Sequence, residues 1–401
     1  MITVEQVSSA VLPAGFPAVR AMPRPSELRQ EGYEKQYDSM TVFCDAFYSD
    51  GRIVLSGPPL FNLRAAIDSG SFRLDRLLPM RPRLSDLWKT QRSFVDWGTY
   101  SLPRKVLRKA VLALAGCRVL SFDVASEGRT ASFRMPLQPD GAARFSGRRV
   151  LFTLQKGNRL EWVRDWAEYY HRIHGVDAVV IYDNGSPDYR PEDLAKVLSE
   201  VDGIEEGCVL SWPFPYGPGS PRDDTWDSDF CQYTALEHMR WRFCRDAEGI
   251  INADIDELVV CDDGRSVFDH LKDSESGFVA YQCNWVEAVA TREIGAERHF
   301  WDFVYRSKKR MLGTKKWTVD PRRMPDDSQF CVHRVKDGPV LEVDESIRHR
   351  HFFAINTDWK RERSAVRPVD PEIHYVDEPL VAALAEAFGE NRLPEDVRAA
   401  S

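Results

Sequence analysis

The spacing of hydrophobic positions changes near residue 148 and divides the chain into regions of different structure. Before that point, short segments of alternating hydrophobic and polar residues flank turn signals, as in Cys117–Val124 and Thr130–Met135 around Glu127-Gly128. Two such segments joined by two turn-forming residues predict a β-hairpin. We therefore expect a β-rich region, interrupted by a short helix over Pro103–Leu114 that has proline in its first turn.

After residue 148, apolar strands alternate with amphipathic helices. The helix after the first strand is predicted to begin with a capping box of Asn158 and Glu161 and to end at Gly175. Its apolar residues recur every three or four positions, as expected for a helix packed on a sheet. The four strands predicted here are Val150–Leu154, Ala178–Tyr182, Cys208–Ser211 and Gly249–Ala253.

This β-α-β succession predicts an α/β domain with a parallel, doubly wound sheet and helices on both faces. Ligands of such sheets bind beyond the carboxyl ends of the strands. Asp183 and Asp254 follow the second and fourth strands, so both are expected at that edge. The predicted organisation is an N-terminal arm (1–35), a β-rich accessory domain (36–147), the α/β domain (148–360) and a partly helical C-terminal extension (361–401).

The fourth strand runs directly into Asp254-Ile255-Asp256-Glu257. In an extended segment, residues i and i+2 project to the same side, so Asp254 and Asp256 present two carboxylates together. Such a hard, oxygen-rich pair suits Mg²⁺ or Mn²⁺. The ion can bridge a diphosphate and neutralise the charge that grows on it as it leaves. The simpler alternative is an exposed acidic loop, in which Glu257 only starts the next element.

Two further acidic residues are candidates for direct roles. Asp183 can accept hydrogen bonds from a base or ribose, although Asp183-Asn184-Gly185-Ser186 is also a favourable turn sequence. Glu287 follows a predicted strand, Phe278–Trp285, and is the candidate general base for an acceptor hydroxyl. The alternative for Glu287 is an ordinary surface glutamate.

Residues 306–323 contain eight basic residues and one acidic residue, in a chain whose net charge is −8. This cluster predicts contact with an anion, which can be a donor diphosphate, a lipid-linked phosphate or an acidic membrane surface. A solvated surface is the alternative. Lys316 and Trp317 are candidate ligand contacts, Trp317 either by stacking on a sugar or by simple packing. His349 and His351 lie on one side of a predicted strand, where they can complete a metal shell.

Composition excludes several classes of protein. With 43% hydrophobic residues the chain is globular, and its negative net charge argues against nucleic acid as the main partner. No apolar stretch reaches the about 20 residues of a membrane span, and residues 1–20 lack the basic start of a signal peptide. The eight cysteines form no C-x-x-C pair, which favours buried thiols in a reducing compartment. We expect a cytoplasmic protein, with peripheral contact to the plasma membrane as an option.

The segments Leu154–Trp162, Ile181–Asp188 and Asp254–Leu258 belong to an ordered series of motifs that covers roughly half the chain. This series resembles the family 2 and family 92 glycosyltransferases. Each segment alone is unspecific, whereas their order is specific. The matching segments are Leu154–Trp162, Tyr169–Asp177, Ile181–Asp188, Gln232-Tyr233, Asp254–Leu258, Lys316–Pro321, Val332–Arg334 and Ile347–His351.

The resemblance implies a GT-A fold that transfers a sugar from a nucleotide-sugar donor, commonly a UDP-sugar, with Mn²⁺ or Mg²⁺. By motif match, Asp183 falls on the nucleotide-contacting position, and Asp254 and Asp256 fall on the metal-binding D-x-D motif. The resemblance also suggests a glycan or lipid-linked acceptor in bacterial surface polysaccharide synthesis.

Two alternatives use a similar sheet. A sugar nucleotidyltransferase usually carries a glycine-rich basic loop after the first strand, where this chain has only Gln155-Lys156-Gly157-Asn158. A nucleotide-sugar-binding module without turnover is disfavoured by the paired carboxylates, because two close carboxylates without a cation repel each other.

Overall fold

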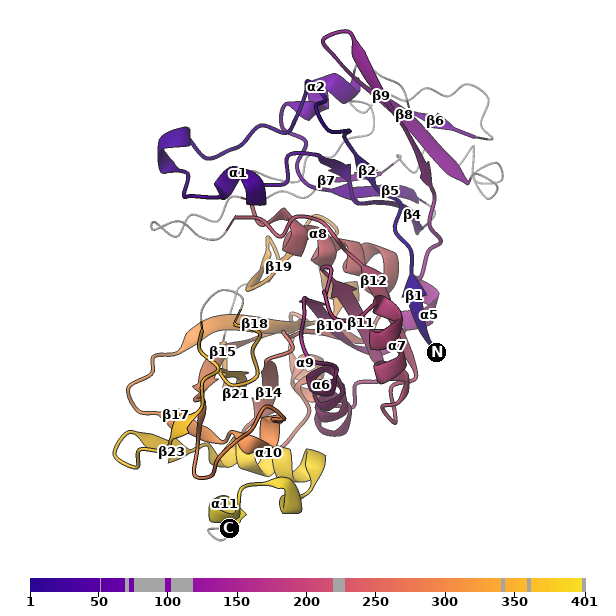
Figure 1. Cartoon of the computed structure of the whole chain (residues 1–401). Coiled ribbons are helices and arrows are strands. Elements are labelled where there is room, and N and C mark those ends of the chain that lie inside the picture. Colours follow the sequence, from indigo (N-terminus) through magenta and orange to yellow (C-terminus); the bar gives the residue numbers. More distant parts are fainter. Residues whose placement is uncertain are drawn as a thin grey trace. The chain divides into compact units, whose positions relative to one another are not determined.

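The computed structural model describes residues 1–50, 52–68, 72–75, 98–101, 118–218, 228–339, 343–358 and 362–398. The chain forms two compact units (Figure 1). The helix predicted over Pro103–Leu114 lies outside the described residues. None of the helices in the described segments is long and apolar enough to cross a membrane. Unit 1 comprises Met1–Glu5, Arg144–Ser211 and Cys244–Ser401, and unit 2 comprises Gln6–Ala143 and Trp212–Phe243.

Unit 1 is an α/β unit built on a nine-stranded mixed sheet, in the order β1-β12-β11-β10-β13-β18-β15-β21-β14. The first five strands of this order are parallel. β18 then runs antiparallel to both of its neighbours, β15 and β21 are parallel, and β14 is antiparallel to β21. The strands are β1 (Ile2–Glu5), β10 (Arg149–Gln155), β11 (Ala178–Asp183), β12 (Glu206–Ser211), β13 (Gly249–Asn252), β14 (Glu257–Cys261), β15 (Phe278–Val286), β18 (Gly313–Val319) and β21 (Val343–Phe352).

The four predicted strands correspond to β10–β13, so the α/β succession is confirmed. The sheet as a whole is mixed, because β18 and β14 run antiparallel to their neighbours. The helices of unit 1 are α6 (Leu160–His174), α7 (Pro191–Ser199), α9 (Val267–Asp273), α10 (Glu378–Phe388) and α11 (Glu395–Arg398), with short turns at η3 (Phe300–Asp302), η4 (Pro321–Arg323) and η5 (Glu390–Arg392).

Two local predictions for unit 1 need correction. The capping box of Asn158 and Glu161 is absent, because Asn158 donates its side-chain amide to Gln155 Oε1 and Arg159 takes the position before α6. Residues 1–35 also do not form a separate arm, since β1 extends the parallel half of the sheet at β12. Ile2 packs directly over Gly207, where a Cβ atom would lie 2.9 Å from the Ile2 side chain.

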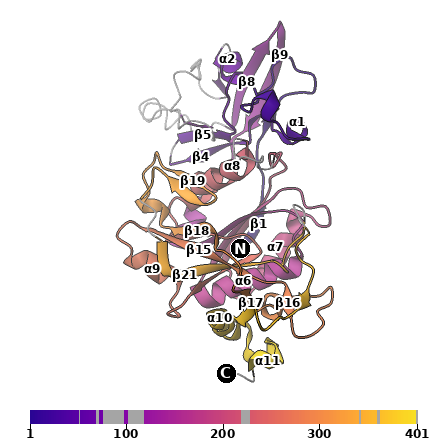
Figure 2. The same ribbon diagram turned by 90° about the vertical axis from the view of Figure 1, so that its left-hand side faces the viewer.

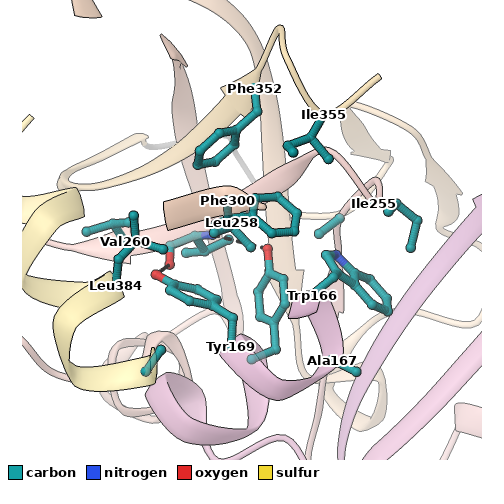
Figure 3. Close-up of a cluster of buried hydrophobic side chains, with 14 of the residues drawn as sticks. Trp166, Ala167, Tyr169, Ile255, Leu258, Val260, Phe300, Phe352, Ile355 and Leu384 are labelled. Atoms are coloured by element: carbon teal, nitrogen blue, oxygen red, sulfur yellow. Dashed lines mark hydrogen bonds between the residues drawn. The ribbon is translucent and has the colours of Figure 1, made fainter. Parts of the chain in front are cut away.

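The edge strand β14 is covered by side chains of α6. The Tyr170 hydroxyl donates to the Glu257 carbonyl and accepts the Val259 amide, and the Tyr169 hydroxyl donates to the Val259 carbonyl. These bonds satisfy backbone groups that an exposed edge would leave open. Figure 3 shows Trp166 and Tyr169 of α6 packed in one core with Ile255, Leu258, Phe300 and Phe352.

The C-terminal segment completes unit 1. α10 packs beside α6, as both ribbon views show (Figures 1 and 2), and it also packs against β14. Asp377 caps α10 by accepting the Leu380 amide, and it also forms a bidentate ion pair with buried Arg350 of β21. Three small sheets complete the unit: β16 (Val289–Ala290) with β22 (Arg367–Pro368), β17 (Tyr305–Ser307) with β23 (His374–Val376), and β19 (Gln329–Cys331) with β20 (Arg334–Lys336).

Unit 2 is rich in short strands, as predicted. The hairpin around Glu127-Gly128 is present between β8 and β9, with φ of 47° and 73° at these two residues. Positive φ at both turn positions is the geometry that matches the twist of paired strands. Its elements are β2 (Ala10–Val11), β3 (Thr41–Phe43), β4 (Asp45–Ser49), β5 (Arg52–Gly57), β6 (Arg73–Leu74), β7 (Gly98–Ser101), β8 (Val119–Ser126), β9 (Arg129–Pro136), η1 (Ser26–Leu28), α1 (Tyr33–Gln36), α2 (Leu63–Asp68) and α8 (Phe230–Met239). At the unit boundaries lie α5 (Ala142–Phe145) and a π-helical turn, η2 (Arg240–Cys244).

Candidate functional site

The carboxyl ends of β10, β11, β12 and β13 lie at one edge of the sheet, because these strands are parallel. The chain passes from β10 outward to β11 and β12, and later returns to β13 on the other side of β10. The strand order therefore reverses between β10 and β13, where open α/β sheets bind their ligands. Asp254 and Asp256 follow the end of β13 directly, so the D-x-D motif starts at this reversal.

Lys316 of β18 holds the first aspartate of the motif. Its ammonium lies 3.0 Å from Asp254 Oδ2 and 3.1 Å from Glu257 Oε2. Burial by itself would lower the pKa of Lys316, but the two carboxylates outweigh it and raise that pKa above its usual value. Lys316 is therefore a cation that is 1% exposed, whereas the Asp254 side chain is 45% exposed and open to a ligand.

Three side chains donate hydrogen bonds to one carboxylate oxygen of Asp256. Its Oδ2 accepts hydrogen bonds from His351 Nε2 at 3.1 Å, Asn356 Nδ2 at 2.8 Å and an Arg363 nitrogen at 3.1 Å. Burial tends to raise the pKa of Asp256, but the charges of His351 and Arg363 outweigh it and lower that pKa to about 2. In turn, burial tends to lower the pKa of His351, and Asp256 raises it to about 10.

Glu257 connects the two histidines to the lysine. Its Oε1 lies 3.5 Å from His349 Nε2 and 3.4 Å from His351 Nδ1, while its Oε2 accepts the Asp254 amide. The predicted placement of His349 and His351 on one side of a strand is confirmed. Burial lowers the pKa of His349 well below its usual value, with Lys316 adding to the effect, so His349 is neutral beside a charged His351.

The donor set fits a divalent cation in part. Asp254 and Asp256 supply carboxylate oxygens, the ligands that Mg²⁺ and Mn²⁺ take. In the described segments, no group of three or more His, Cys, Asp and Glu side chains is arranged to hold a metal ion. An ion held by Asp254 and Asp256 would need further oxygen ligands from outside the protein, such as water or a diphosphate. His351 Nε2 binds Asp256 in this arrangement, and the metal-ligand role of His349 and His351 stays a prediction.

Asp183 lies at the same edge, but its carboxylate accepts hydrogen bonds within the turn that follows β11. Its carboxylate accepts the Ser186 amide at 3.1 Å, the Ser186 hydroxyl and the side-chain amide of Gln155, which ends the neighbouring β10. Gly157, with φ of 65°, donates its amide to the Ser186 hydroxyl and closes the loop after β10. The turn interpretation of Asp183 is confirmed, and its contact to a nucleotide stays a prediction.

Glu287 follows β15 at the carboxyl end, and its side chain is 2% exposed. Arg310 binds both carboxylate oxygens, at 2.9 and 3.2 Å, and Arg367 lies 3.5 Å away. Glu287 is therefore not an ordinary surface glutamate. As a base it would have to exchange the Arg310 contact for an acceptor hydroxyl, so its catalytic role stays a prediction.

Trp317 is fully buried, and its indole N–H donates to the Cys331 carbonyl at 2.7 Å. Its ring therefore packs in the core and has no face open to a sugar. Trp285 of β15 is the aromatic side chain that borders the carboxylates. It lies against His351 and stacks on Phe353, with ring centroids 4.4 and 4.7 Å away, and it is partly exposed.

Three site residues were not among the sequence candidates. Asn356 and Arg363 bind Asp256 from the segment after β21, and no local pattern distinguishes them from loop residues. Trp285 lies two residues before Glu287 at the end of an apolar strand, so its position at the strand's carboxyl end was the one available signal. A scan against models of known families and a search of curated proteins found no match to this chain.

Proposed function

We propose that this chain is a metal-dependent GT-A glycosyltransferase that moves a sugar from a nucleotide-sugar, most simply a UDP-sugar, to a glycan or lipid-linked acceptor. One observation carries the proposal. At the reversal of strand order, a half-exposed carboxylate, Asp254, adjoins a buried one, Asp256, and both are held by cations. This is the edge at which such sheets bind nucleotides.

The local charges suit a diphosphate. Lys316, His351 and Arg363 surround the two aspartates. A divalent ion bound there would supply charge neutralisation for the leaving diphosphate. The protein's own part is to hold Asp254 toward the ligand through Lys316 and to keep Asp256 ionised, because its pKa of about 2 keeps it deprotonated at neutral pH.

Binding without turnover is the second candidate, because Glu287 is occupied by Arg310. A base already paired with a guanidinium is less available for a hydroxyl proton. Release of the diphosphate from a bound nucleotide-sugar distinguishes the two candidates, since a binding module gives a thermal shift and no product.

The test is thermal unfolding with nucleoside diphosphates and nucleotide-sugars, with and without Mn²⁺, followed by release of the diphosphate from each sugar donor that binds. Bound ligand raises the melting temperature by mass action. We expect a shift with a uridine diphosphate only when Mn²⁺ is present.

The variants Asp254→Asn and Asp256→Asn should lose this Mn²⁺-dependent shift and at least about 100-fold of the product release, consistent with loss of a metal ligand. Asp262→Asn is the matched control, because Asp262 follows β14 at the opposite end and is 47% exposed. No shift with any nucleotide, or full activity in Asp256→Asn, would reject the proposal.

A further inference from the structure

The loop between β17 and β18, Lys308–Leu312, exposes all five of its side chains. We call it the basic-apolar loop. Met311 is 85% exposed and Leu312 is 56% exposed. Single exposed apolar residues are normal, but two adjacent ones that follow three consecutive basic residues form an amphipathic tip.

The stretch of sequence that contains this tip is basic in an acidic chain. Residues 303–319 contain six basic residues and no acidic residue, although the whole chain carries a net charge of −8. Neither Lys308 nor Lys309 forms an ion pair with a carboxylate of the described residues, and the Lys308 ammonium donates to the Glu372 carbonyl at 3.3 Å. Tyr375 pairs with Arg306 in the adjacent two-stranded sheet, and its ring is a third exposed large side chain beside Met311 and Leu312.

We propose that the basic-apolar loop is a membrane-contact loop that inserts Met311 and Leu312 into a bilayer surface with anionic headgroups. Apolar side chains gain free energy by leaving water, and lysines near an anionic surface add electrostatic attraction. Each lysine at such a surface strengthens binding by about fivefold. The partner is a lipid surface, because the tip is a small protruding loop rather than a broad apolar face.

The loop is directly connected to the candidate site. Arg310 lies over the Phe353 ring, 4.7 Å from its centroid, while binding Glu287. Arg363 lies over the same ring, 5.6 Å from its centroid, and binds Asp256. If the proposed function holds, a bilayer at Met311 places a lipid-linked acceptor beside the D-x-D motif.

A cavity of about 440 Å³ borders Leu312 and Tyr375, but its charges do not suit a phosphate headgroup. Three arginines and four acidic residues line it, and Arg350 is already committed to Asp377. We therefore assign the lipid contact to the loop tip and not to this cavity.

The test is flotation of the full-length protein with vesicles of phosphatidylcholine alone and of phosphatidylcholine mixed with phosphatidylglycerol. We expect binding to the anionic vesicles only. The double variant Met311→Asp/Leu312→Asp should lower this binding more than tenfold, and Lys308→Gln/Lys309→Gln should lower it about 25-fold while leaving less dependence on salt.

Matched controls separate lipid contact from general charge and folding effects. Leu28→Asp removes an equally exposed leucine, at 55%, and Lys196→Gln/Lys272→Gln removes two exposed lysines elsewhere. Both controls should bind like the wild type. Equal binding of all variants, or no binding by the wild type, would overturn the inference.

A change of oligomeric state in Met311→Asp/Leu312→Asp without any vesicle binding by the wild type would instead assign the tip to a protein interface, which also overturns it. The nucleotide-induced thermal shift should persist in the loop variants. Its loss in Asp254→Asn alone would therefore report on the proposed function and not on the membrane contact.

Discussion

The nine-stranded sheet has a parallel half (β1, β12, β11, β10 and β13) and a mixed half (β18, β15, β21 and β14). The two halves differ in the kind of side chain that they bury. In the parallel half, β11 (Ala178–Asp183) is buried throughout and has one charged residue, at its carboxyl end. In the mixed half, Lys316, Glu257 and Arg350 are buried within or at the start of strands, each at 2% exposure or less. The parallel half is therefore stabilised by apolar packing, and the mixed half depends on paired charges.

This difference separates scaffold from site. Apolar packing fixes the strands without charged partners, whereas buried ion pairs are stable only while every partner remains. The charged network of Lys316, Glu257 and Asp256 is continuous with the half-exposed Asp254. The mixed half is thus the part in which ligand binding can exchange one partner for another.

The largest expected effect on stability comes from removing the buried lysine of the mixed half, Lys316. Lys316→Met removes the cation that pairs with Glu257 Oε2 and Asp254 Oδ2, so we expect the free energy of unfolding to fall by about 3–5 kcal/mol in urea titration. The double variant Lys316→Met/Glu257→Gln should recover more than half of this loss. Lys196→Met, at an exposed position on α7, should stay within about 0.5 kcal/mol of the wild type. A loss below about 1 kcal/mol for Lys316→Met contradicts the contrast.

Truncation in the parallel half should act without a charge effect. Leu151 of β10 is fully buried, so Leu151→Ala should lower the free energy of unfolding by about 2–5 kcal/mol through lost burial and a cavity. Because no titrating group changes its partner, the loss should be equal at neutral and at mildly acidic pH. A loss that varies strongly over this range would show that the parallel half is also charge-dependent.

His174, which contacts β14 of the mixed half, should make the free energy of unfolding depend on pH. Its Nε2 lies 2.9 Å from the Val259 carbonyl, and its Nδ1 accepts the Val267 amide, which fixes the neutral ring. Burial lowers the pKa of His174 to about 4, against 6.5 when unfolded. Its stabilisation is therefore complete above pH 6.5 and falls by at most about 3 kcal/mol as the pH drops to 4.

The corresponding measurement is urea unfolding of wild type and His174→Gln across this pH window. The variant should be less stable at neutral pH and should show a shallower decline toward acid, since the group that takes up the proton is missing. Parallel pH profiles for the two proteins would refute the assignment.

The smallest expected effect concerns the tyrosine hydroxyl groups of α6 that bond to the backbone of the edge strand β14. Tyr170 makes two backbone hydrogen bonds there, whereas Tyr169 makes one to a carbonyl that His174 also contacts. Tyr170→Phe should therefore cost about 2 kcal/mol and Tyr169→Phe about 1 kcal/mol in urea unfolding. The reverse order would mean that edge hydrogen bonds do not set the difference.

Local patterns predicted the scaffold well because its signals lie within short stretches of chain. The strands β10 to β13, the end of α6 at Gly175 and the hairpin at Glu127-Gly128 follow from burial periodicity and turn chemistry. The same approach failed at Asn158, where a side chain with two local options bonds to Gln155 instead of capping the helix.

Site residues were predictable where they follow a strand or where their residue type stands out, as Lys316 does in the basic cluster and His349 and His351 do on one side of a strand. Asp254, Asp256 and Asp183 were found because the carboxyl ends of parallel strands share an edge. Arg363 was not, because it contacts Asp256 from 107 positions away in the sequence. For Trp317 the sequence left stacking on a sugar and simple packing open, and the structure shows packing, with its ring against Phe330 in the core.

The sequence by itself determined the strands β10 to β13, the helix between β10 and β11, and the carboxylates at the carboxyl ends of β11 and β13, because hydrophobic period and turn residues act over a few positions. Tertiary structure alone decided the partners of the charged side chains: Lys316 with Asp254 and Glu257, His351 and Arg363 with Asp256, and Arg310 with Glu287. The physical reason is that a buried charge requires an opposite charge within a few ångströms, and that partner is supplied by whichever strand the fold places alongside.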